Sequence, residues 1–481
     1  MTVASGLAIL PSIMIGIAVV QLLTPEGGVD RILLKLFLGT GLGVGISSCL
    51  FYFWRLVFPD LHTGYFYFEL LILILLWVTV FWRGFPGLVS EKWNKIKLKS
   101  KLLWFLSAAL AGIAVIAGMS FIAHQEANPH GAYDAWAIWN LHARMLFRGG
   151  EFWQSGFSIH LYHADYPLLL PASIARVWYL LQEETYRTSM LLPVVFVVSM
   201  VGLMFSVILI GRSVFQALLA VIVLTGTAWF VEVASIQYAD MPLAWYVLAT
   251  GSLLYLFFRS HGKNKGFLVL GGMSVGMASW TKNEGILFLV VVTVIVFITI
   301  WFSYKYERRS HFLRYLFAYI MGLSLPLGAL ISFKLVLAPP NDLVSGQNMG
   351  WVVQALTNVD RYLEVFQYLS AVIFDTWQIW LLVGILIYLL GAGPDVRIAA
   401  EGTSLRVTLT IFCVMLAAVV GIYILSPWTP EIHIRTSAGR VLLQIYPLFV
   451  LNIFLISADL GDLMESLKLT SKRNLPHAAN N

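Results

Sequence analysis

Apolar stretches alternate with short polar segments along the whole chain, and most apolar stretches are close to the length of a membrane-crossing helix. A helix of about 20 residues crosses the roughly 30 Å hydrocarbon core of a bilayer. We expect spans at 7–23, 31–54, 66–83, 102–122, 188–209, 214–231, 241–258, 266–280, 285–303, 315–337, 371–391, 407–425 and 438–457. Because lipid offers no hydrogen bonds to the backbone, helices are the expected spanning element. The pattern predicts an all-α, polytopic transmembrane bundle of about 13 spans.

Composition excludes a water-soluble globular protein. Of the 481 residues, 59% are hydrophobic and 12% are charged, which leaves too few polar side chains to cover a soluble surface. The first apolar stretch lacks a basic segment before it and a small-residue cleavage site after it, so we expect a retained span. The 31 Lys and Arg residues exceed the 25 Asp and Glu residues, but most of them lie in short loops. There they set topology, and nucleic-acid binding is not expected.

The positions of the basic residues predict which loops face the cytoplasm. Lysines cluster at 92–101, and Lys305 shares a short loop with three arginines at 308–314. Both loops are expected on the cytoplasmic side. Alternation then places on the outer side the segments 55–65, 123–187, 232–240, 338–370 and 426–437, together with the turn at 281–284. The long outer loop 123–187 contains an apolar stretch at 166–182, which we interpret as a juxtamembrane helix.

Asp134 lies shortly after a predicted span, between Tyr133 and Ala135, in an aromatic-rich segment. A carboxylate shielded by aromatic rings is suited to take a proton from a hydroxyl or an amine. The alternative is that Asp134 caps the next helix while Trp136 and Trp139 belong to an interfacial aromatic belt.

Two further acidic segments fall on the predicted outer side. The sequence His160-Leu161-Tyr162-His163-Ala164-Asp165 could bind a divalent metal or a sugar phosphate, although its spacing is not diagnostic. Asp240 begins an apolar span, where a carboxylate is costly and usually functional. It could act as a second acid or share an ion with Asp134. An N-cap before Pro242 is the alternative.

Basic residues on the same side suggest a phosphate site. Lys282 lies in the turn before Glu284 and could contact a lipid phosphate, or the two could simply neutralise each other. His433, Arg435 and Arg440 lie around the start of the last span, where they could stabilise a leaving phosphate. The alternative is that the arginines reach lipid headgroups or pair with Glu431.

Taken in order, these segments resemble the C-type superfamily of membrane glycosyltransferases, which includes protein O-mannosyltransferases and the lipid A aminoarabinose transferase. The resemblance rests on Asp134, Asp165-Tyr166-Pro167-Leu168, Asp240-Met241-Pro242-Leu243, the Lys282 turn and His433-Ile434-Arg435-Thr436-Ser437 with Arg440. It covers about residues 102–457. The chain departs from the superfamily in three ways: Asp134 is not part of a carboxylate pair, the three extra N-terminal spans have no counterpart with an assigned role, and no large soluble C-terminal domain is evident.

The resemblance implies an inverting transfer of a sugar from a polyprenyl-phosphate carrier to a lipid, glycan or protein acceptor on the outer face of a bacterial inner membrane. It implies Asp134 and Asp240 as catalytic carboxylates, with Asp165, His163 and Glu284 near the sugar or acceptor. Lys282, His433, Arg435 and Arg440 would bind the donor phosphate. A divalent cation, Mg or Mn, could be held by Asp134 and Asp240.

The predicted organisation has three parts: a three-span N-terminal extension with its basic loop (1–101), the transferase-like domain (102–457) and a short cytoplasmic tail (458–481). A transporter or flippase for a lipid-linked sugar is the rival function. It would place charges at the bilayer midplane, whereas here they crowd one interface.

Overall fold

The structure, a computed structural model, describes residues 2–24, 29–59, 64–84, 101–158, 160–304, 309–341, 349–394 and 402–458. Within these ranges the chain is helical and forms no strand, apart from an isolated bridge between Pro394 and Ser457. Ten helices are long and apolar enough to cross a membrane, or up to twelve if each of two bent pairs is one span. The prediction of an all-α polytopic membrane protein is confirmed. Most of the predicted basic loop and tail lies outside the described residues.

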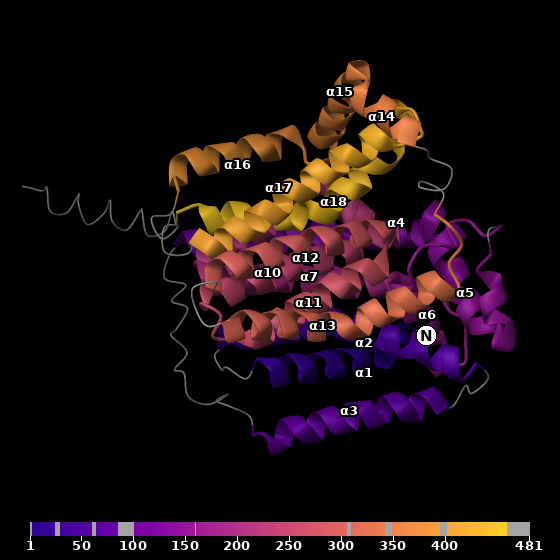
Figure 1. Ribbon diagram of the computed structural model, residues 1–481. Coiled ribbons are helices and arrows are strands. Elements are labelled where there is room, and N and C mark those ends of the chain that lie inside the picture. The colour runs from indigo at the N-terminus through magenta and orange to yellow at the C-terminus, as the bar shows by residue number, and fades with distance from the viewer. Residues whose placement is uncertain are drawn as a thin grey trace, which may run out of the picture.

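These ten long helices are α1 (Thr2–Leu23), α2 (Val29–Val57), α3 (Gly64–Trp82), α4 (Lys101–Ala127), α7 (Tyr186–Gly211), α10 (Asp240–Arg259), α12 (Asn283–Tyr304), α13 (Arg309–Val336), α17 (Gly402–Leu425) and α18 (Pro430–Ile456). Helix α11 (Lys265–Thr281), on the predicted span 266–280, has 17 residues and is not among them. The shorter elements are the π-helical turn η1 (Ala135–Trp139), α5 (Asn140–Arg148), the 3₁₀ turn η2 (Gly150–Gly156), α6 (Leu169–Leu181), α8 (Val214–Gly226), α9 (Ala228–Ser235), α14 (Met349–Thr357), α15 (Val359–Thr376) and α16 (Ile379–Ala392). The long helices lie side by side across Figure 1.

Helix α10 forms the centre of the bundle and packs against α7, α11, α17 and α18. Its most apolar window is 100% buried, whereas the corresponding window of α4 is only 6% buried and that of α3 only 17%. A helix that is apolar on all sides and exposed needs lipid around it. The exposed faces of α3 and α4 therefore belong to the lipid-facing surface.

Small residues bring α1 and α2 into backbone contact. A Cβ atom on Gly16 would lie 1.9 Å from the carbonyl oxygen of Gly39, and one on Gly43 would lie 1.9 Å from that of Ser12. No side chain larger than hydrogen fits at either position. This is the close approach that small residues allow between membrane helices.

The N-terminal helices belong to the same hydrophobic core as the rest of the bundle, since α2 packs against α6 and α7. A buried ion pair also joins α3 to α6: Arg176 donates through Nε and Nη2 to Glu69, at 2.8 and 2.6 Å. Its Nη1 donates to the carbonyl oxygen of Ala8 in α1, at 2.9 Å. The predicted boundary at residue 101 thus does not mark a break in packing.

Two of the predicted spans are bent. The stretch 214–231 divides into α8 and α9, which meet at 62°, and 371–391 divides between α15 and α16, which meet at 82°. Thr227 is extended between α8 and α9, and Gln378 has a φ of 56°, outside the helical region. Neither stretch is one continuous helix, and the number of spans depends on whether each bent pair counts as one. In Figure 1, α15 projects at an angle to the long helices, and it packs against α18 and α17.

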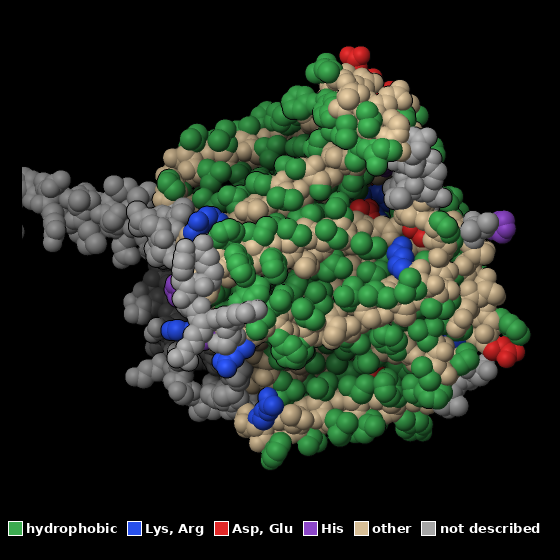
Figure 2. Space-filling view, in the orientation of Figure 1, with side chains coloured by type: hydrophobic (Ala, Val, Ile, Leu, Met, Phe, Trp, Pro, Cys, Tyr) green, Lys and Arg blue, Asp and Glu red, His purple; other side chains and the backbone are tan. Residues whose placement is uncertain are grey.

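The bundle has two chemically different ends. The site end is the one at which α10, α12 and α18 begin, and α5 and α6 lie there (Figure 1). The basic end is the one at which α11, α13 and α17 begin. Lys and Arg side chains gather toward the basic end in Figure 2, while the visible acidic side chains lie toward the other end. The predicted outer segment 166–182 forms α6, a 13-residue helix that packs against α5 and α2 at the site end.

Candidate functional site

Asp134 and Arg440, 306 positions apart in sequence, form an ion pair at the site end. The Asp134 side chain is 20% exposed and that of Arg440 is 23% exposed. Asp134 occupies the N-cap position of η1, but its side chain makes no capping hydrogen bond, so the pair with Arg440 replaces that alternative. Its backbone N–H donates to the Tyr238 hydroxyl at 3.1 Å. The guanidinium of Arg440 lies 5.0 Å from the centre of the Tyr238 ring.

Asp240 is fully buried at the start of α10 and accepts two hydrogen bonds through Oδ1. One comes from Lys282 Nζ at 3.0 Å and the other from Gln444 Nε2 at 2.7 Å. Lys282 also pairs with Glu284 at 2.9 Å, so the neutralising pair considered from the sequence is present, together with a second carboxylate. Burial opposes the charge on Lys282, but Asp240 and Glu284 outweigh it and hold the lysine pKa above its ordinary value.

The two pairs are joined through α18. Arg440 and Gln444 are four residues apart and therefore share one face of the helix. Arg440 contacts Asp134, Gln444 contacts Asp240, and Arg440 also interacts electrostatically with Asp240. We call Asp134, Arg440, Asp240, Lys282 and Glu284 the ion-pair network.

Asp165 lies next to this network in a second polar cluster. Its buried carboxylate accepts hydrogen bonds through Oδ2 from Asn283 at 2.7 Å and from Asn341 at 2.8 Å. Lys334 Nζ lies 3.6 Å from the same oxygen and donates to Asn283 Oδ1 at 3.0 Å. Because Asn283 follows Lys282 directly, the Asp165 cluster and the ion-pair network share the α11–α12 turn.

Tyr166 lies between the carboxylate clusters, and its hydroxyl interacts electrostatically with Glu284 and Lys282. Burial raises the pKa of this phenol above its usual range, so it stays protonated. His163 stacks on the Tyr166 ring at 4.6 Å and 17°, and Trp139 stacks on it at 5.6 Å and 27°. The φ of His163 is 49°, in the left-handed region. His163 is therefore part of an aromatic stack beside the network.

Two of the predicted phosphate binders form no hydrogen bond or ion pair with the network, although His433 interacts electrostatically with Glu284. Arg435 is exposed, pairs with Glu431 at 3.2 Å and lies over the ring of Tyr368, which is the alternative considered from the sequence. His433 shares a hydrogen bond with Ser426 at 2.7 Å and lies 4.9 Å from the ring of Tyr423. Both stand one or more turns before Arg440 on α18.

Sequence reasoning missed several residues of the two clusters. Gln444 and Lys334 lie inside predicted spans, and a polar side chain in an apolar run is itself a signal of function. Asn283 directly follows Lys282, which was predicted to bind phosphate. Asn341 carries no such signal, because it lies among the polar residues of a loop.

Three carboxylate oxygens in the described part of the site accept no hydrogen bond. They are Oδ2 of Asp240, Oδ1 of Asp165 and Oε2 of Glu284, all shielded from solvent. Buried polar atoms are normally paired. The buried part of the site therefore has three unused hydrogen-bond acceptors.

Among the described residues, no group of three or more His, Cys, Asp or Glu side chains is placed to hold a metal ion. Asp134 and Asp240 are each paired with a cationic side chain instead.

No family model matches the chain, and no curated protein and no solved structure matches it either. The class of the protein therefore rests on its structure: its apolar helices make it an integral membrane protein of the polytopic helical class, with a buried charge network at one end.

Proposed function

We propose that the protein is a membrane glycosyltransferase that moves a sugar from a polyprenyl-phosphate carrier to a lipid, glycan or protein acceptor at the site end. One observation carries the proposal. Asp134, a carboxylate that can act as a base, forms a partly exposed pair with Arg440, a guanidinium that can bind phosphate. This pair adjoins the buried carboxylate of Asp240 and its partner Lys282.

The donor phosphate would take Arg440 from Asp134. Guanidinium groups bind phosphate through paired hydrogen bonds, so an arriving phosphate competes for the same donors. Asp134 is then free to accept the acceptor proton. The acceptor oxygen forms a bond to the anomeric carbon as the bond from that carbon to the phosphate oxygen breaks. The electron pair of the broken bond stays on the phosphate, which Arg440 neutralises.

The buried part of the network would stabilise the transition state. Three carboxylates, on Asp134, Asp240 and Glu284, are set against the two cations Lys282 and Arg440. Glycosyl transfer passes through a transition state with positive charge on the sugar ring, and fixed negative charge favours it. The open oxygens of Asp240 and Glu284 would accept hydrogen bonds from sugar hydroxyls. No step in this scheme passes through a metal ion, and a role for Mg or Mn stays a prediction.

The test is transfer by the purified chain in vesicles that contain a radiolabelled polyprenyl-phosphate sugar. We expect release or transfer of label by the wild type, and a loss of about 100-fold or more in Asp134→Asn, the range for removal of a general base. Asp360→Asn is the matched control, since this exposed carboxylate begins α15 outside the network. Wild-type activity in Asp134→Asn would remove the assigned base. Movement of intact labelled lipid across the bilayer, without sugar release, would establish the flippase instead.

A further inference from the structure

A groove of about 520 Å³ opens at the basic end of the bundle, between the end of α1 and the starts of α11 and α13. Helix α11 separates it from the ion-pair network, because Lys265 begins this helix and Lys282 follows its last residue. At 1.5 Å per residue the two lysines are about 25 Å apart along the helix axis. The groove therefore cannot belong to the proposed transfer site.

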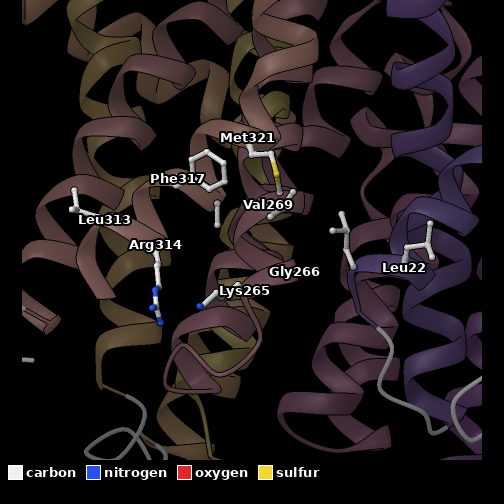
Figure 3. A pocket seen from close by; sticks show the side chains of 10 residues that line it. Leu22, Lys265, Gly266, Val269, Leu313, Arg314, Phe317 and Met321 are labelled. Atoms are coloured by element: carbon white, nitrogen blue, oxygen red, sulfur yellow. The ribbon is translucent and has the colours of Figure 1, made fainter. Parts of the chain in front are cut away.

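The groove combines apolar walls with two cations. In Figure 3 the nitrogen atoms of Lys265 and Arg314 lie toward the same end, while Phe317, Met321 and Val269 lie farther along the helices. No carboxylate is among the described residues that line it. A small anionic group fits the first part and a hydrocarbon chain fits the second.

The α13 side of the groove faces the membrane, and its floor is formed where α11 packs closely against α1. Leu313 is 53% exposed, Phe317 69% and Met321 45%, so the α13 side of the groove is open to lipid. At the floor, a Cβ atom on Gly266 would lie 1.8 Å from the carbonyl oxygen of Leu23. That close approach holds the start of α11 against the end of α1. Since both residues line the groove, the packing of these two helices fixes the shape of its floor.

We propose that this groove binds one anionic phospholipid of the surrounding membrane. Its phosphate lies between Lys265 and Arg314, and one acyl chain runs along Phe317 and Met321. A zwitterionic headgroup would bring its own cation next to these two and is disfavoured. A soluble phosphate would leave the apolar walls uncovered.

The test compares lipids that remain bound to the purified protein in native mass spectrometry. The probes are phosphatidylglycerol and phosphatidylcholine with identical acyl chains. We expect the wild type to retain one phosphatidylglycerol, and Lys265→Ala with Arg314→Ala to reduce retention at least tenfold. The control is Lys263→Ala with Arg406→Ala, two exposed cations that do not line the groove, which should leave retention unchanged.

A third variant and a third probe separate the lipid from other ligands. Met321→Trp should fill the apolar part and lower retention of phosphatidylglycerol with both cations intact. Equal retention of phosphatidylcholine, equal loss in the Lys263/Arg406 control, or equal retention by Met321→Trp would each overturn the proposal. Binding of glycerol 3-phosphate as tight as that of phosphatidylglycerol would show a soluble-phosphate site and would also overturn it.

Discussion

The two ends of the bundle handle charge in opposite ways. At the site end the cations Lys282 and Arg440 are paired with carboxylates of the same chain, and Asp240 is fully buried. At the basic end Lys265 and Arg314 are exposed beside an apolar groove. A buried charge needs an internal partner, because water is not there to solvate it. An exposed charge can take its partner from outside, so the two ends favour different partners: side chains of the same chain at the site end and external anions at the basic end.

The largest expected effect comes from removing the cation that bridges the network. Arg440→Met deletes the proposed phosphate ligand and should lower transfer by about 100-fold or more, as loss of a charge-stabilising donor does. Arg314→Met, at the basic end, should change transfer by less than about twofold, because the proposed reaction takes place at the opposite end of the bundle. Initial rates in vesicles decide this. Equal losses in the two variants would erase the distinction between the ends.

Lys282→Met should destabilise the fold strongly, because Asp240 would lose its buried cation. Breaking a buried pair in this way costs about 3–5 kcal/mol. Adding Asp240→Asn should recover part of the loss, since it removes the stranded charge. Lys265→Met, by contrast, should stay within about 0.5 kcal/mol, as for most surface changes. Unfolding free energies in mixed micelles provide the measurement, and similar costs for the two lysine variants would contradict the comparison.

Acid should weaken the site end through His142, a buried residue of α5 whose pKa burial lowers to about 4. The unfolded chain binds this proton near pH 6.5, so stability falls as the pH drops from about 6.5 toward 4. The loss is about 2 kcal/mol at pH 5. His142→Leu should flatten that part of the curve of melting temperature against pH. A curve of unchanged slope in the variant would show that another group is responsible.

The smallest effect is expected for Arg435→Ala. Arg435 is exposed and its pair with Glu431 is of the solvent-screened kind, worth about 0–1 kcal/mol. Transfer should change less than twofold, although the residue is only five positions from Arg440. A loss as large as that of Arg440→Met would place Arg435 in the reaction and would extend the site beyond the network.

Much of the architecture could be predicted because lipid imposes long apolar helices. The positions of the basic loops also predicted that Asp134, Asp240, Lys282 and Arg440 lie on the same side of the membrane. The structure brings these four residues together at one end. Hydropathy alone does not predict the bends at Thr227 and Gln378. There a few extended or left-handed residues break the helix without changing its apolar character.

Helical phase explains why Arg435 and Arg440 differ. Five residues turn a helix by about 500°, so the two side chains point about 140° apart. Gln444 follows Arg440 by four residues and faces the same way, and this spacing could have identified it. By contrast, the contact between Asp165 and Asn341 joins two loop residues, and no periodicity in the sequence signals it.

The pair between Glu69 and Arg176 also bears on how the chain is made. The glutamate is synthesised 107 residues before its partner, in a helix whose surface is mostly turned to lipid. At about 5–20 residues per second, roughly 5–20 s pass before Arg176 exists. A charged side chain at the centre of a membrane helix costs about 2.5–3.5 kcal/mol on insertion scales, and an unpaired Glu69, five residues after the start of α3, is expected to cost less than that. During that interval α3 can already pack against α1, but Glu69 lacks its cation, so this last contact of α3 forms only after α6 has been synthesised.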